Sequence, residues 1–104
     1  MLPIQRLKRS NTIDNLWIYI LTLIKDASDA HPAYAYELRT MIENAFHFKC
    51  GQITAYRVLY RLEGDGFVIS YQIERKRVYK ITEKGLKELQ AGKDFFRELT
   101  SKLG

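Results

Sequence analysis

The sequence is poor in the residues that build most catalytic and metal centres. Its 104 residues include one cysteine and two histidines. A structural zinc site needs four closely spaced ligands, and beside His47 and Cys50 the chain offers only His31. Glycine-rich phosphate-binding loops are missing too, because Gly64 and Gly66 are typical of a helix end. We therefore expect no enzyme, no metal and no cofactor.

Long apolar runs are also missing. The most apolar segment, WIYILTLI, stops at Lys25 and Asp26, well short of the ~20 residues that span a bilayer. The N-terminal segment MLPIQRLKRSN is basic but lacks the apolar stretch and cleavage site of a signal peptide. The single cysteine gives no indication of an oxidising compartment. We expect one compact domain, no membrane segment and a cytoplasmic location.

The charge that is present is mainly positive, with a formal net charge of +5. Basic residues are concentrated in an N-terminal arm, in the segment Ile53–Phe67 and in a cluster between residues 75 and 80. Each group alone is typical of a solvated surface. Together they predict a polyanionic partner if the fold brings them to one side.

Apolar periodicity predicts four helices and two strands. The expected elements are a helix from Thr12–Asp14 to Asp26, a second from Pro32 to Asn44–Phe46, a third over Ile53–Gly64, strands over 67–73 and 78–82 joined by a tip at 74–77, and a last helix from Thr82–Glu83 to Leu103. Three helices followed by a two-stranded hairpin are the order of a winged helix-turn-helix. The predicted fold class is therefore mainly α with a small antiparallel β-hairpin (α+β).

The third helix has two different faces. Ala55, Val58, Leu59 and Leu62 form a packing face at helical spacing. The other side carries Thr54, Tyr56, Arg57, Tyr60 and Arg61, with no acidic residue before Glu63. Because nothing on this side neutralises the arginines, we expect it to enter the major groove of double-stranded DNA, where phosphates and base edges complete it.

Individual roles follow from side-chain chemistry. We expect Thr54 and Arg57 to contact base edges and Arg61 to bind phosphate. Tyr56 and Tyr60 either donate to phosphates or pack partly against the wing. In the wing, Arg75, Lys76 and Arg77 are expected on phosphates, and the alternative is a merely soluble hairpin tip.

Cys50 allows two interpretations. Its position before a helix and next to Lys49 could lower the pKa of the thiol and make it a redox sensor. The alternative is a plain, partly buried cysteine.

The last helix carries an apolar stripe that extends beyond what one small domain can bury. We expect it to pair with a second copy, and the alternative is that only its first half packs. The expected dimer residues are Trp17, Leu89, Phe95, Phe96, Leu99 and Leu103. Residues 1–82, with a basic arm at 1–11, would then form the DNA-binding domain and 83–104 the dimerisation helix.

Three segments resemble one family. TAYRVLYRLEGDGFV, HPAYAYEL and RVYKITEKGLKEL are similar to the recognition helix, the second helix and the wing-to-last-helix region of the PadR-like transcriptional regulators. The resemblance covers roughly residues 13–90 and departs from the family pattern at Ile53, where glycine is usual, and at Ala33 and Ala35. It implies a homodimeric winged-helix DNA-binding regulator, usually a repressor. Some members bind aromatic effectors at the dimer interface, where Trp17, Phe95 and Phe96 would lie.

Two other functions are compatible with the fold. A winged helix can serve as a protein-interaction module, and a basic surface can bind DNA without sequence preference, as chromatin-type proteins do. The first would show an exposed apolar patch in place of the cations of the third helix, and residues 54–61 have none.

Overall fold

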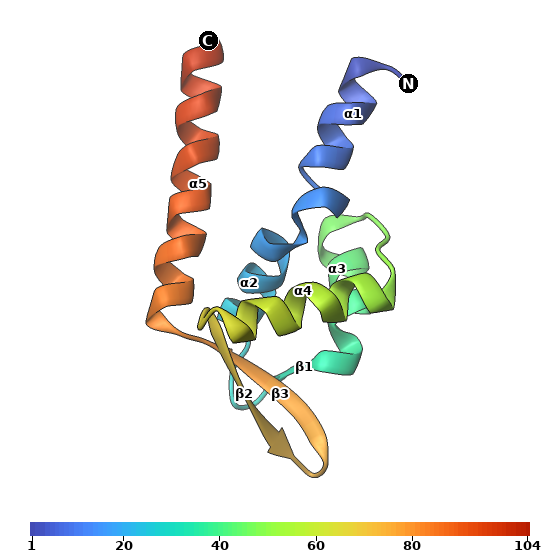
Figure 1. Ribbon diagram of the computed structural model, residues 1–104, viewed down its shortest axis with the longest axis vertical. Helices are drawn as coiled ribbons and strands as arrows, with labels where there is room; N and C mark the ends of the chain where they lie inside the picture. Colours follow the sequence, from blue (N-terminus) through green and yellow to red (C-terminus); the bar gives the residue numbers. More distant parts are fainter.

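The computed structural model describes all 104 residues. Its elements are α1 (Pro3–Ser10), η1 (Ile13–Asn15), α2 (Leu16–Asp26), β1 (Ala33–Tyr34), η2 (Ala35–Glu37), α3 (Leu38–Phe46), α4 (Gln52–Gly64), β2 (Val68–Ile73), β3 (Lys76–Ile81) and α5 (Glu83–Leu103). The molecule measures 48 × 28 × 24 Å. It is elongated because α1 and α5 project from one end and the β2–β3 hairpin from the other (Figure 1).

Helix α2 is the centre of the core. It packs against α3, α4, α5 and β3. Its residues Leu16, Ile20, Leu21 and Ile24 are buried, as expected of a helix that is apolar over most of its circumference. The predicted end at Asp26 is confirmed.

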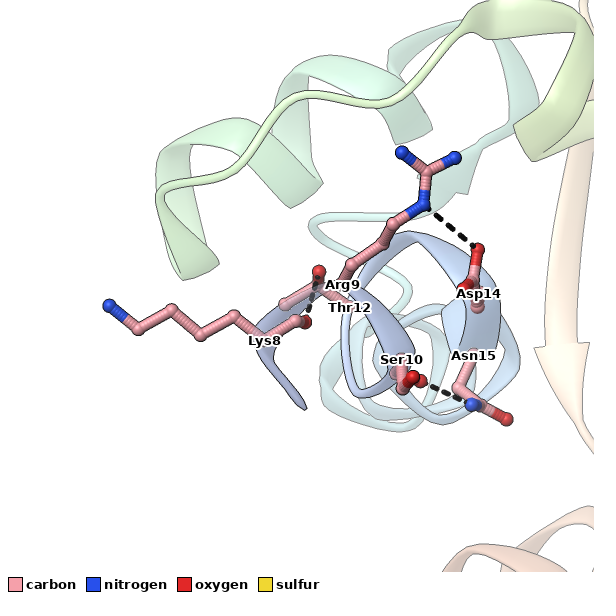
Figure 2. Close-up of polar contacts among 6 residues, drawn as sticks. All are labelled: Lys8, Arg9, Ser10, Thr12, Asp14 and Asn15. Carbon is pink, nitrogen blue, oxygen red and sulfur yellow. Dashed lines mark hydrogen bonds and ion pairs between the residues drawn. The ribbon is translucent and has the colours of Figure 1, made fainter. Parts of the chain in front are cut away.

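The start of this helix was predicted incorrectly. The 3₁₀ turn η1 precedes α2, and Thr12 makes no capping hydrogen bond. Its hydroxyl instead donates to the carbonyl of Lys8, 2.7 Å away, in the preceding helix (Figure 2).

The N-terminal arm is a helix, which the sequence reading missed. Pro3 occupies the first turn, where its missing N–H is harmless, and Gln5 accepts a hydrogen bond of 2.9 Å from the Leu2 N–H. No residue of α1 is buried. An ion pair of 3.8 Å between Arg9 and Asp14 ties α1 to the turn that follows (Figure 2). The arm lies far from the hairpin, so this basic group does not join the other two (Figure 1).

The second predicted helix also begins later than expected. Ala33 and Tyr34 are extended and pair with Tyr79 and Val78 of β3. The sheet is therefore three-stranded and antiparallel, in the order β1-β3-β2, instead of a two-stranded hairpin. Pairing with β1 satisfies backbone N–H and C=O groups of β3 that would otherwise lie at an open sheet edge. This gain outweighs the local preference of Pro32 for the first turn of a helix.

Helices α4 and α5 and strand β2 agree with prediction, whereas β3 begins two residues earlier than expected, at Lys76. Helix α4 ends at the glycine-rich turn, where Gly66 has φ +81°. Thr82 caps α5 by accepting a hydrogen bond of 3.1 Å from the Gly85 N–H. Gly85 is required there, since an added Cβ would lie 2.1 Å from the carbonyl oxygen of Phe67.

Candidate nucleic-acid interface

Helix α4 lies across the body of the molecule, between the projecting α1 and α5 and the hairpin (Figure 1). Its packing face is as predicted. Ala55, Leu59 and Leu62 are buried, and Val58 is half-buried against the core. These contacts fix the helix and determine which side chains point outward.

The outward side of α4 keeps its cations unpaired. Thr54, Arg57, Tyr60 and Arg61 are exposed, whereas Tyr56 is half-buried. Neither arginine lies within ion-pair distance of a carboxylate. Because Arg57 and Arg61 are one turn apart, both can reach the same polyanion.

The two tyrosines of α4 stack on each other. Their ring centroids are 6.2 Å apart, with an interplanar angle of 21°. The Tyr56 hydroxyl accepts a hydrogen bond of 3.0 Å from the Gln52 side chain, and Tyr60 remains 56% exposed. The Tyr60 ring is therefore open to an external partner, not covered by the wing.

The wing tip is narrower than expected. Only Glu74 and Arg75 form the turn, with φ values of +50° and +70°. Two successive positive φ values are those of a type I′ turn, whose twist matches that of the flanking strands. Lys76 and Arg77 belong to β3, so the prediction of three consecutive cations at the tip was wrong.

Two of the wing cations have partners within the chain. The Lys76 ammonium lies 5.6 Å from the ring centroids of both Tyr34 and Tyr36. The Arg77 guanidinium lies 3.8 Å from the Glu63 carboxylate. Of these three cations, only Arg75 is both exposed and unpaired. It is therefore the strongest candidate in the wing for a contact with the phosphate backbone of a nucleic acid.

Tyr79 of β3 belongs to the hydrophobic core. It is 2% exposed, and its hydroxyl is buried without a hydrogen-bond partner. Burial raises the pKa of this phenol, so Tyr79 is neutral at physiological pH. Its role is therefore packing within the core.

Cys50 is half-buried, and this burial raises the pKa of its thiol. The shift is opposite in direction to the one that the redox-sensor interpretation required. No group of three or more His, Cys, Asp or Glu side chains is arranged to hold a metal ion.

The expected dimer residues are distributed over two environments. Leu89 is buried in the core of its own chain, and Trp17 is half-buried against that core. Phe95, Phe96, Leu99 and Leu103 are exposed along the projecting half of α5. Gly92 allows α5 to approach α2 closely, since an added Cβ would lie 2.9 Å from Ile18 and 3.0 Å from Trp17.

Sequence reasoning missed several side chains of this region. Tyr34 was assigned to a helix but lies in β1, and Tyr36 lies in the 3₁₀ turn η2. The pairing of β1 with β3 that places both rings beside Lys76 had no local signal. Ile53 was noticed only as a departure from a family pattern, yet it is 76% exposed at the second position of α4. Its exposure could have been found from helical spacing, since Ile53 lies one turn before Arg57 within the predicted helix.

Helices α3 and α4, joined by residues 47–51, form a helix-turn-helix. Together with the three-stranded antiparallel sheet beside them and the unpaired cations of α4, they define a winged-helix DNA-binding protein. The family model described as "Transcriptional regulator PadR-like family" matches residues 20–91. The chain belongs to this family of transcriptional regulators. The comparison with curated proteins found no match. No helix of the structure is long and apolar enough to span a membrane.

Solved structures are similar over most of the chain. A PadR family regulator from Eggerthella lenta is 22% identical with a TM-score of 0.75, covering 97% of this chain and 85% of that one. A PadR-like regulator from Bacillus cereus is 22% identical with a TM-score of 0.71, covering 92% of each chain. A transcriptional regulator from Clostridium thermocellum is 28% identical with a TM-score of 0.69, covering 85% and 87%.

Proposed function

We propose that this regulator is a repressor that binds an inverted-repeat operator as a homodimer. Helix α4 of each copy enters the major groove, and each wing follows the adjacent backbone. The observation that carries this proposal is the outward side of α4, where Arg57 and Arg61 are exposed without a carboxylate partner. Repression requires no activity beyond occupying the operator.

The side chains of α4 divide into two roles. Thr54 and Arg57 lie in its first half, which comes nearest the bases, and they read base edges. Arg61, Tyr56 and Tyr60 bind the sugar–phosphate backbone, which fixes the register of the helix.

In the wing, Arg75 binds phosphate without losing an internal contact. Lys76 and Arg77 also reach the backbone, but each exchanges a partner within the chain for a phosphate. Their contribution to affinity is therefore smaller than that of Arg75.

The homodimer is supported by the apolar surface that α5 exposes. Phe95 is 60% exposed and Leu103 is 79% exposed, on a helix that projects from the body of its own chain (Figure 1). Ile4 and Leu7 of α1 are exposed at the same end of the molecule. A second copy would bury both helices and could hold two α4 helices about one DNA turn, ~34 Å, apart.

A small aromatic effector is also part of the proposal. Trp17, Phe95 and Phe96 line a cavity of about 150 Å³ beside Gly92. Asn11 and Asn15 also line this cavity, and its volume is about that of a cavity that holds one benzene-sized ring. A ligand bound here would contact both α2 and α5 and change how they pack. In the dimer, this would alter the spacing of the two α4 helices.

The test is selection of bound fragments from the genome of the source organism at moderate salt. A recurrent inverted repeat supports the proposal. Binding to DNA without a recurrent sequence indicates a chromatin-type protein, and no DNA binding at all indicates a protein-interaction module. Either of these outcomes contradicts the proposal.

A further inference from the structure

Ile53 is an exposed aliphatic side chain in the middle of a polar surface. It is 76% exposed, more than any other large apolar residue except Met1 and Leu103 near the chain ends. It occupies the second position of α4, and it does not belong to the core or to the residues packed against it.

Its position on the helix places it at the centre of the outward side. Ile53 precedes Arg57 by four residues and Tyr60 by seven, so the three side chains share one face. The buried residues Ala55, Leu59 and Leu62 lie on the opposite face. Of the exposed apolar side chains, Ile53 is therefore the one placed to meet a base first.

Folding gives no reason for isoleucine at this position. A β-branched residue is a poorer helix former than alanine, and an exposed side chain buries no apolar area within its own chain. Single exposed aliphatic residues are common on protein surfaces. What distinguishes Ile53 is its location, one helical turn from the unpaired Arg57.

We propose that Ile53 reads a thymine in each half-site by packing against the 5-methyl group in the major groove. The inference rests on the proposed function and adds a residue to its base-reading set. Residues at the start of a recognition helix contact base edges, and the thymine methyl is the one apolar group that base pairs present in the major groove. An isoleucine offers no hydrogen bond to guanine, adenine or cytosine and covers their polar edges, so it disfavours them.

The test removes only the methyl group. Each thymine of the selected operator is replaced in turn by deoxyuridine, which pairs identically, and affinity is measured by fluorescence anisotropy. For the wild type we expect one position per half-site where deoxyuridine weakens binding about fourfold, equivalent to the ~0.8 kcal/mol of one buried methyl group.

Two variants and a control make the test specific. Ile53→Ala should abolish the difference between thymine and deoxyuridine at that position, while Ile53→Val should retain most of it. Ile69→Ala removes a similarly exposed isoleucine, 55% exposed on β2, and should leave the whole pattern unchanged.

The outcomes separate this inference from the function on which it rests. If the wild type binds its operator but no thymine methyl matters, or if Ile53→Ala keeps the full penalty, the role of Ile53 is refuted and the regulator function stands. If no sequence is preferred over random DNA, both are refuted.

Discussion

The carboxylate of Glu63, near the end of α4, lies 3.8 Å from the guanidinium of Arg77 on β3. Its other oxygen accepts a hydrogen bond from the Ser70 hydroxyl on β2. One acidic side chain thus joins α4 to both strands of the wing. The same carboxylate partly neutralises a cation that faces the proposed DNA surface.

We predict that removing the negative charge of Glu63 raises the affinity for DNA. Glu63→Gln keeps an acceptor for Ser70 but releases Arg77 from its ion pair. We expect affinity for random duplex to rise about threefold, and the slope of log affinity against log salt to steepen by about 0.9 if Arg77 takes one phosphate. Glu98→Gln, the same charge change on α5, is the control and should leave the slope unaltered. An unchanged slope in Glu63→Gln would show that Arg77 does not reach the backbone.

The outward side of α4 could be predicted from sequence, but its coupling to the wing could not. Periodicity alone separates Leu59 from Arg57, because a helix of thirteen residues has one buried side. The pairing of Glu63 with Arg77 depends on the register of β2 with β3, which no local pattern encodes. The unpaired state of Arg57 likewise became known only from the arrangement of all carboxylates in space.

Two errors have different physical origins. β1 forms because Ala33 pairs with Tyr79, far along the chain, and this tertiary contact overrides local preference. Helix α1 was missed because its sequence carries little apolar periodicity. It buries no residue within its own chain, and Ile4 and Leu7 are its only large apolar side chains.

The wing provides the second prediction. Arg75→Ala should weaken binding to all sequences alike and reduce the salt slope by about 0.9, the value for one lost phosphate contact. Arg77→Ala should reduce it less, because Glu63 already pairs with that side chain. Lys87→Ala, an exposed cation of α5, serves as the control. If Arg75→Ala and Lys87→Ala change the salt slope equally, the wing tip does not contact DNA.

The third prediction concerns folding and compares two helical glycines. An added Cβ at Gly85 meets the Phe67 carbonyl oxygen at 2.1 Å, whereas at Gly64 it meets nothing within 4 Å. Gly85→Ala should therefore reduce the free energy of unfolding by about 3 kcal/mol through overpacking. Gly64→Ala should be neutral or raise it by up to about 1 kcal/mol. Urea denaturation followed by circular dichroism measures both, and similar stabilities would contradict the close approach of α5 to Phe67.

The fourth prediction concerns assembly. Phe96→Asp combined with Leu99→Asp should give monomers, because two carboxylates would be forced into an apolar seam. Such monomers would bind a half-site weakly, having lost the second, effectively intramolecular contact. Phe96→Leu with Leu99→Met is the matched control and should remain dimeric. Sedimentation of the three proteins decides this, and a monomeric wild type would exclude α5 as the source of half-site spacing.

The central claim is that α4 reads DNA sequence. Its most direct test is the ratio of affinities for the selected operator and for random duplex of equal length, measured at one salt concentration for wild type and Arg57→Ala. We predict a wild-type ratio of at least about 10³. Losing one bidentate contact should lower operator affinity by about 1–3 kcal/mol per half-site and relax preference at a single position. A wild-type ratio near one, or a ratio that Arg57→Ala leaves unchanged, would contradict this account.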